Sequence, residues 1–172
     1  SYVADRVDIP MIVYNVPSRT GIGCTAETYK ILSEHPNING IKEASGDMSY
    51  AMKVARYIGD DFAMYCGNDD QILPILSLGG QGVISVLSNV LPKETHDICA
   101  LYRAKNTAES CALQLKVLPL IRALFSDVNP IPVKEAMNML GMNVGGYRLP
   151  LCEMSEKGAA DLAAALKEFN LI

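Results

Sequence analysis

The feature of this sequence that most constrains its fold is a regular alternation of short apolar runs with amphipathic segments. Four runs of apolar, β-branched and aromatic residues predict buried strands: residues 9–15, 38–43, 62–65 and 82–87. Each run follows the last by roughly 20 to 30 residues with a helical pattern between them, which is the spacing of βαβ units. We therefore predict an α/β fold with a parallel sheet.

Helix signals lie between and after these runs. Thr25 is a candidate N-cap for a helix that ends before Pro36. Asp47 or Ser49 could cap a second helix that ends at Gly59. The other expected helices are residues 68–78, disturbed by Pro74 and closed by Gly79-Gly80, and a helix that begins at Pro92 and reaches about Ala104.

The strand pattern stops after about Lys105, and the rest of the chain has a helical pattern. The expected helices are residues 107–126 with a kink at Pro119, residues 132–140, and residues 155–169 with Ser155 as the cap. We predict two domains, residues 1–104 with four βα units and residues 105–172 as a C-terminal helical domain. Four strands are half of those in a (β/α)8 barrel, and 172 residues are fewer than the about 250 of a complete barrel.

Composition and charge exclude several classes of protein. Lys and Arg number 15 and Asp and Glu number 19, and the net charge of −4 with interspersed signs argues against binding to nucleic acid or an anionic membrane. No stretch approaches the roughly 18 uninterrupted apolar residues of a spanning helix, and the first residues form no signal-peptide core. Five widely spaced cysteines without a Cys-x-x-Cys pair indicate free thiols and no zinc site, so we expect a cytoplasmic protein.

Polar residues follow each predicted strand, which is where the active sites of (β/α)8 barrels assemble. The segments are residues 14–21, 42–47, 65–70 and 84–89. Lys42 is the most distinctive residue in them, because it interrupts a strand in which Ile38 and Ile41 are apolar. Loss of hydration favours its neutral amine, which attacks carbonyls and is what a Schiff-base lysine requires. The alternative is that Lys42 pairs with an acid or extends into solvent.

Three other residues at the strand ends have both a functional and a structural interpretation. Tyr14 could transfer protons through its phenol, or it could be a core aromatic whose hydroxyl finds a backbone partner. Arg19 could bind a substrate carboxylate with two hydrogen bonds, or it could be a solvated or structural arginine. Gly67 is either a turn residue or a point where the backbone approaches a ligand.

Other conspicuous residues favour structural interpretations. Asp69 and Asp70 are better explained as helix N-caps than as metal ligands, because no histidine or third acid lies near them in sequence. His35 and His96 lack a serine, cysteine or acid at a triad-like spacing, which is typical of structural or surface residues. The glycines of residues 79–82 do not form a phosphate-binding pattern, so nucleotide binding has no support.

Four motifs at these strand ends resemble the second half of the dihydrodipicolinate synthase family. They are Tyr-Asn-Val-Pro-Ser-Arg-Thr-Gly at 14–21, Gly-Ile-Lys-Glu-Ala-Ser-Gly-Asp at 40–47, Gly-Asn-Asp-Asp at 67–70 and Gly-Gly-Gln-Gly-Val-Ile-Ser-Val at 79–86. The match is strongest from Ile9 to Pro92 and looser in the helical tail. Tyr-Asn-x-Pro and Ile-Lys are also similar to the wider pyruvate-dependent aldolase superfamily, which includes N-acetylneuraminate lyase, and Arg19 favours the synthase.

The resemblance implies the C-terminal half of a (β/α)8 TIM barrel followed by a helical domain. It also implies a lyase that condenses pyruvate with L-aspartate 4-semialdehyde in the diaminopimelate pathway of lysine biosynthesis. Lys42 would form an imine with pyruvate, and Tyr14 would relay protons. Arg19 would hold the semialdehyde carboxylate, while the Ile84 backbone carbonyl and Gly67 would line the pyruvate pocket. No metal or diffusible cofactor is expected, because the lysine imine is itself the electron sink.

The resemblance also implies which parts of a complete site are missing. The family's Thr-Thr-Gly element, a second tyrosine from a neighbouring subunit and most of the lysine feedback site belong to the first half of the barrel. We therefore expect a fragment that needs the N-terminal half of the same protein, is inactive alone, and belongs to a homotetramer. Four strands would leave two edges and an unburied inner face. Two alternatives stay open: another pyruvate-dependent lyase or aldolase, and a non-catalytic half-barrel module.

Overall fold

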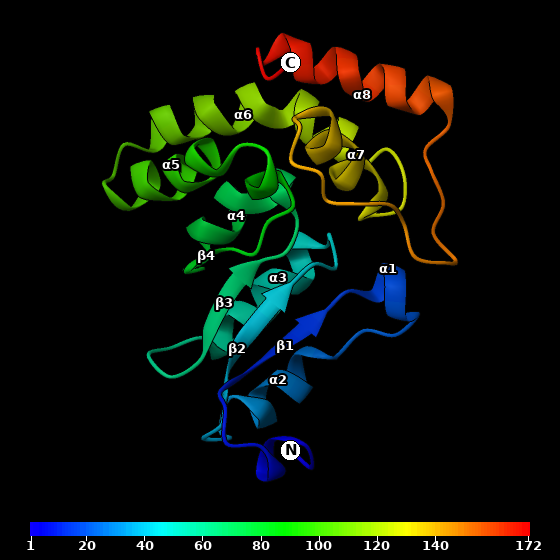
Figure 1. Cartoon of the computed structure of the whole chain (residues 1–172). Helices are drawn as coiled ribbons and strands as arrows, with labels where there is room; N and C mark the ends of the chain where they lie inside the picture. Colours follow the sequence, from blue (N-terminus) through cyan, green and yellow to red (C-terminus); the bar gives the residue numbers. More distant parts are fainter. The chain divides into compact units, whose positions relative to one another are not determined.

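The predicted strands form one parallel sheet in the structure, a computed structural model that describes residues 1–172 (Figure 1). The strands are β1 (Met11–Asn15), β2 (Ile38–Glu43), β3 (Ala63–Cys66) and β4 (Gly82–Val83). They lie in the order β1-β2-β3-β4, and every neighbouring pair is parallel. The predicted α/β fold with a parallel sheet is therefore confirmed.

The fourth strand is shorter than the predicted residues 82–87. β4 ends at Val83, and the Ile84 N–H makes one more hydrogen bond, to the carbonyl of Cys66 at 2.9 Å. Because β3 is the only neighbour of β4 and ends at Cys66, the chain then has no strand to pair with. It forms instead a short 3-10 helix, η4 (Leu87–Asn89). An apolar run predicts a strand, but its length depends on where the neighbouring strand stops.

Short helices connect the strands. They are η1 (Ala4–Arg6), α1 (Pro17–Thr20), α2 (Ala26–Leu32), α3 (Met48–Val54), η2 (Ala55–Tyr57), η3 (Asp69–Gln71) and α4 (Ile72–Ser77). The Thr25 side chain accepts a hydrogen bond from the Thr28 N–H and caps α2 as predicted. Asp47 accepts from the Tyr50 N–H, so Asp47 and not the alternative Ser49 is the cap of α3.

Two local features differ from the sequence prediction. The single turn of α1 was not expected, because four residues are too few to show helical periodicity. It ends at Gly21, whose φ of 71° is the left-handed conformation that glycine adopts freely. Pro74 was expected to disturb its helix, but it lies in the first turn of α4, where a missing N–H costs no helical hydrogen bond.

The sheet has one buried face and one open face. Successive side chains of a strand point to opposite faces. Ile41 and Met64, on one face, are fully buried, whereas Ile12 and Tyr14, on the other, are 46% and 47% exposed. The register pairs Tyr14 with Lys42, so these two side chains share the open face. The predicted unburied inner face is therefore present in the structure.

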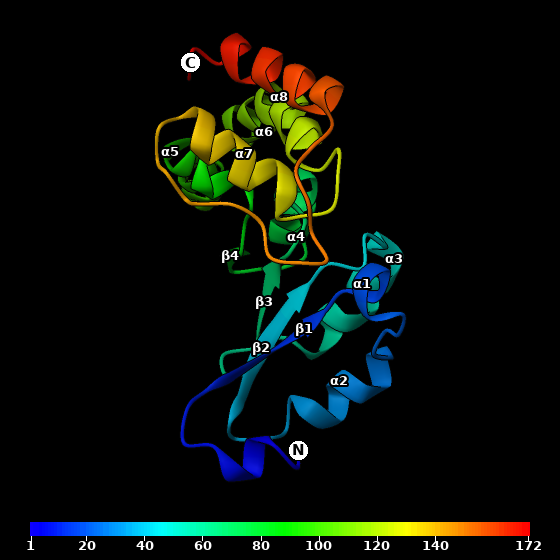
Figure 2. The ribbon, with the colours of Figure 1, turned by 45° about the vertical axis from the view of Figure 1, so that its right-hand side comes forward.

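The contacts divide the chain into two compact units, Ser1–Ile84 and Ser85–Ile172. After η4 the second unit consists of α5 (Pro92–Arg103), α6 (Thr107–Leu124), α7 (Ile131–Met139) and α8 (Glu156–Glu168) (Figure 2). α5 packs against α6, and α8 packs against α6 and α7. Ser155 accepts a hydrogen bond from the Gly158 N–H and caps α8 as predicted. None of the helices is both long and apolar enough to cross a membrane.

The boundary between the compact units differs from the predicted division into residues 1–104 and 105–172. α5 packs against α6, so contacts group it with the helices that follow. The predicted division instead follows barrel architecture, in which α5 completes the fourth βα unit. That division stays a prediction about the architecture.

Candidate active site

The five predicted site residues all lie in the first compact unit, at the carboxyl ends of the strands or just beyond them. Tyr14 is in β1 and Lys42 is in β2. Gly67 directly follows β3, and Ile84 directly follows β4. Arg19 lies in α1, the turn that follows β1. Because the strands are parallel, these ends meet along one edge of the sheet.

Lys42 and Tyr14 face each other across neighbouring strands. The two residues are partners in the register of β1 and β2. The Nζ atom of Lys42 lies 4.2 Å from the centre of the Tyr14 ring, within the range in which a cation is attracted to an aromatic face. The structure therefore brings together the predicted nucleophile and the predicted proton relay.

The surroundings of Lys42 disfavour its charged form. Burial is the largest effect and lowers the pKa of the Lys42 amine below its ordinary value. The Asp69 carboxylate acts in the opposite direction, and the positive charge of Arg19 lowers the pKa further. A larger fraction of the amine is consequently neutral near pH 7 than for an exposed lysine, and the neutral amine is the nucleophilic form.

The position of Arg19 follows from the turn that carries it. Pro17 begins α1, and the Gly21 N–H closes the turn by donating to the Pro17 carbonyl at 2.9 Å. The turn sets Arg19 on an exposed segment, from which its charge acts on Lys42. A guanidinium there could bind a carboxylate that lies near the lysine.

Gly67 is required by the close approach of β2 and β3. Its N–H donates to the Glu43 carbonyl at 2.7 Å. A Cβ atom at this position would lie 2.6 Å from the Cβ of Ala44 and 2.9 Å from the Glu43 carbonyl oxygen. Packing alone thus accounts for the glycine, and its role in lining a substrate pocket stays a prediction. The Ile84 side chain is 40% exposed, and the role of its carbonyl also stays a prediction.

Asp69 is a candidate site residue for which the predicted role of N-cap is wrong. Asp69 and Asp70 were predicted to be N-caps, but the N-cap positions of η3 and α4 are Asn68 and Gln71. Asp69 is instead buried, and its carboxylate raises the pKa of Lys42. Its place just beyond the end of β3 was the available signal, because a carboxylate there can reach a lysine on the neighbouring strand.

The two histidines match their structural interpretation. His35 Nε2 lies 2.9 Å from Asp5 Oδ1, and His35 Nδ1 accepts from the Asn37 N–H. His96 is exposed and lies beside Asp97. No group of three or more His, Cys, Asp and Glu side chains is arranged to hold a metal ion.

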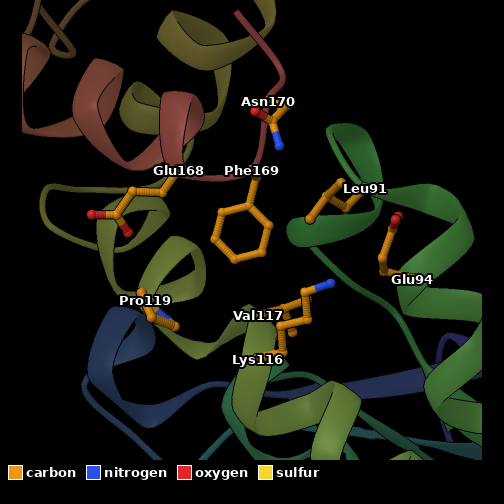
Figure 3. Close-up of a pocket in the computed structure, with 8 residues that line it drawn as sticks. All are labelled: Leu91, Glu94, Lys116, Val117, Pro119, Glu168, Phe169 and Asn170. Atoms are coloured by element: carbon orange, nitrogen blue, oxygen red, sulfur yellow. The ribbon is translucent and has the colours of Figure 1, made fainter.

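The helical unit contains a separate cavity of about 320 Å³ (Figure 3). In Figure 3 the ring of Phe169 lies in the middle of the lining residues. The cavity is lined by Leu91, Glu94, Lys116, Val117, Pro119, Glu168, Phe169 and Asn170. None of the predicted site residues lines it, so it adds nothing to the chemistry at the strand ends.

A parallel βα sheet with a partly desolvated lysine beside a tyrosine at its carboxyl edge defines an α/β barrel-type protein with a candidate carbonyl-binding site. The comparisons with known proteins specify this class further. The chain belongs to the dihydrodipicolinate synthetase family, whose model matches residues 1–169.

Individual relatives agree with this assignment. The 4-hydroxy-tetrahydrodipicolinate synthase of Caldicellulosiruptor saccharolyticus is 54% identical over 169 residues, which are 98% of this chain and 57% of the relative. That of Clostridium perfringens strain 13 is 52% identical over 172 residues, which are 100% of this chain and 59% of the relative. The crystal structure of dihydrodipicolinate synthase from Thermotoga maritima matches with a TM-score of 0.95 at 41% identity, over 99% of this chain and 59% of that one.

The chain therefore spans 57% to 59% of the length of these relatives. Its four parallel βα strands and the helices that follow match that share of a barrel enzyme. The predicted fold class, a partial (β/α)8 barrel followed by a helical region, is confirmed.

Proposed function

We propose that this chain is part of a 4-hydroxy-tetrahydrodipicolinate synthase, a lyase that condenses pyruvate with L-aspartate 4-semialdehyde in the diaminopimelate pathway to lysine. The observation that carries the proposal is the position of Lys42, whose Nζ lies 4.2 Å from the ring centre of Tyr14 at the strand ends. The family and the names of the relatives support the choice of reaction.

In the proposed reaction the neutral Nζ of Lys42 attacks the ketone carbon of pyruvate. The resulting carbinolamine loses water and becomes a protonated imine. The positive imine nitrogen withdraws electrons, so a methyl proton leaves and an enamine forms. The lowered pKa of Lys42 supports this step, because only the unprotonated amine can attack.

The enamine carbon then adds to the aldehyde carbon of the semialdehyde, and the aldehyde oxygen takes up a proton and becomes a hydroxyl. The amino group of the semialdehyde next attacks the imine carbon, closes a six-membered ring and releases the amine of Lys42. One water is released in the whole sequence and the lysine is regenerated. The protonated lysine imine is itself the electron sink, so the proposal includes no metal and no diffusible cofactor.

The other site residues have proposed roles that their positions support. Tyr14, beside the amine, relays protons as the carbinolamine forms and the ring closes. Arg19 binds the carboxylate of the semialdehyde, and its charge already acts at Lys42. Gly67 and the Ile84 carbonyl line the pyruvate pocket, which their places directly after β3 and β4 support.

We further propose that the complete enzyme is a cytoplasmic homotetramer in which the N-terminal half of the same protein supplies the pyruvate-carboxylate site. The share of the relatives' length that this chain spans supports the need for a second half. The open face of the sheet supports it too, because parallel sheets in α/β proteins are covered on both faces.

Turnover by the full-length protein tests the proposed reaction. We expect consumption of pyruvate with L-aspartate 4-semialdehyde and no cleavage of N-acetylneuraminate. Lys42→Ala should abolish turnover, whereas the matched control Lys53→Ala, at an exposed lysine of α3, should leave it unchanged. Cleavage of N-acetylneuraminate without use of the semialdehyde would contradict the choice of reaction. Near wild-type turnover by Lys42→Ala would contradict the assigned nucleophile.

A further inference from the structure

A buried polar pair lies directly behind the Lys42 site. Asn15 follows Tyr14 in β1 and Glu43 follows Lys42 in β2, and the register pairs the two. Because side chains alternate along a strand, Asn15 and Glu43 point to the face opposite the candidate site. Both are only 3% exposed. Figure 2 shows α2 and α3 on one side of β1 and β2.

Hydrogen bonds fix both side chains of this pair. Glu43 Oε2 accepts from Asn15 Nδ2 at 3.0 Å, and Glu43 Oε1 accepts from the Ser45 N–H at 2.6 Å. Asn15 Oδ1 accepts from the Cys24 N–H at 3.2 Å. The carboxylate thus needs a donor from Asn15, while Asn15 needs its oxygen for Cys24, so only one orientation of the amide satisfies every group.

The network extends to Cys24, in the segment that follows α1 and its residue Arg19. The carbonyl of Cys24 accepts a hydrogen bond from the Tyr50 hydroxyl of α3 at 2.6 Å. Burial raises the pKa of Tyr50, and the nearby Glu43 carboxylate raises it further, so the hydroxyl stays a donor. The ends of β1 and β2, the segment after α1 and the first turn of α3 are therefore joined by one set of bonds.

A buried carboxylate is an unfavourable way to fill the space behind a sheet. Apolar side chains of similar size are often at least as stabilising as a buried charged network, whereas directional bonds specify geometry. The geometry that they specify here is the register in which Tyr14 meets Lys42. A displacement of about 1 Å in a catalytic group can reduce the rate by about a hundredfold.

We propose that Asn15 and Glu43 are positioning residues for the candidate site. Their hydrogen bond holds the ends of β1 and β2 so that Tyr14 and Lys42 face each other, and the bond from the Cys24 N–H anchors the segment that follows α1, the turn with Arg19. This inference rests on the proposed function, because the geometry that it protects is that of the imine-forming pair.

Exchanging the two functional groups tests the pair in the full-length protein. In Glu43→Gln one acceptor becomes an NH2 donor, which faces a donor on either side, the Asn15 amide or the Ser45 N–H. Turning the Asn15 amide only moves the conflict to the Cys24 N–H. In Asn15→Asp two buried carboxylates meet. The double variant Asn15→Asp/Glu43→Gln restores a donor opposite an acceptor and keeps acceptors for the N–H groups of Cys24 and Ser45.

The rate of imine formation with pyruvate, trapped by borohydride, is the readout. We expect each single variant to form the imine about ten- to a hundredfold more slowly than the wild type. The double variant should return to within about threefold of the wild type. Wild-type rates in both single variants would overturn the proposal, and so would a double variant as slow as the two single effects combined. A merely space-filling role predicts no such rescue.

Tyr50→Phe keeps the inference testable if a single variant does not fold. It removes one half-buried hydroxyl and leaves the Asn15–Glu43 bond in place. We expect a several-fold higher KM for the semialdehyde with the rate of imine formation unchanged, because only the segment after α1 loosens and the adjoining turn with Arg19 is held less firmly. The control Tyr2→Phe changes an exposed tyrosine and should alter neither value. An unchanged KM in Tyr50→Phe would overturn the anchoring of that segment.

A second readout separates this inference from the proposed function. A reagent that modifies unprotonated amines can label Lys42 without pyruvate. The rate of labelling depends on the surroundings of the Lys42 amine. The same pattern of altered single variants and a restored double variant is expected. Absence of a pyruvate adduct in the wild type would contradict the proposed function, whereas equal labelling of all four proteins would contradict the positioning pair.

Discussion

At the scale of single residues, the reactivity of Lys42 depends on opposing influences. Burial and the charge of Arg19 lower the pKa of its amine, and the carboxylate of Asp69 raises it. The sequence predicted the lysine because a charged residue inside an apolar strand is conspicuous. The effect of Asp69 on the pKa of Lys42 could not be predicted in the same way. Whether the Asp69 carboxylate is buried near Lys42 or exposed to solvent depends on the path of the chain after β3, which the strand pattern does not specify.

Replacement of Asp69 should shift the pH dependence of imine formation. The rate rises with pH until the amine is fully neutral, so its midpoint follows the pKa of Lys42. Because the Asp69 carboxylate raises that pKa, Asp69→Asn should move the midpoint to lower pH. The control Asp70→Asn, at the exposed neighbour, should not move it. A midpoint that stays in place or moves upward in Asp69→Asn would show that the carboxylate does not act on the lysine.

Replacement of Arg19 should weaken binding of the semialdehyde. A hydrogen bond to a charged group contributes about 1.5 to 3 kcal/mol, which corresponds to an increase in KM of about ten- to a hundredfold in Arg19→Ala. Steady-state kinetics with varied semialdehyde measure this value. Arg56→Ala, at an exposed arginine of η2, is the control. Unchanged semialdehyde kinetics in Arg19→Ala would refute the proposed role of Arg19.

At the scale of secondary-structure elements, local signals predicted the helix starts well. Thr25 and Ser155 cap their helices because the capping bond involves only residues three positions apart. Features that depend on neighbouring elements were not predicted from the sequence. The end of β4 is set by the end of β3, and the bonds from Glu43 depend on the register of β1 and β2. The apolar pattern of one strand shows neither where the neighbouring strand ends nor the register between the two strands.

The cap of α3 can be tested by a matched pair of variants. Asp47→Ala removes the acceptor of the Tyr50 N–H and should lower the free energy of unfolding by about 1 kcal/mol. Ser49 lies inside the same helix and makes no capping bond, so Ser49→Ala should leave the free energy of unfolding unchanged. Chemical denaturation of the full-length protein measures both values. A larger loss in Ser49→Ala than in Asp47→Ala would reverse the assignment.

The close approach of β2 and β3 can be tested at Gly67. A methyl group there would meet Ala44 and the Glu43 carbonyl, so Gly67→Ala should lower the free energy of unfolding by about 1 to 3 kcal/mol. At Gly59 a Cβ atom would meet nothing within 4 Å, so Gly59→Ala should be tolerated. Equal stability of the two variants would argue against the tight contact at Gly67.

At the scale of the whole molecule, the parallel sheet has one buried face and one open face. Helices cover one face, while Ile12 and Tyr14 on the face of the candidate site are 46% and 47% exposed. The number of strands was readable from the sequence, and it predicted half of a barrel. The residues of this chain could not show the geometry of the remaining share of the barrel, because the chain spans only 57% to 59% of its relatives.

The role of Lys42 as the imine-forming nucleophile is tested by incubating the full-length protein with pyruvate, reducing it with borohydride and mapping the adduct by mass spectrometry. We expect one pyruvate-derived adduct per chain, on Lys42, and none in Lys42→Ala. An adduct on another lysine, or no adduct in the wild type, would contradict it.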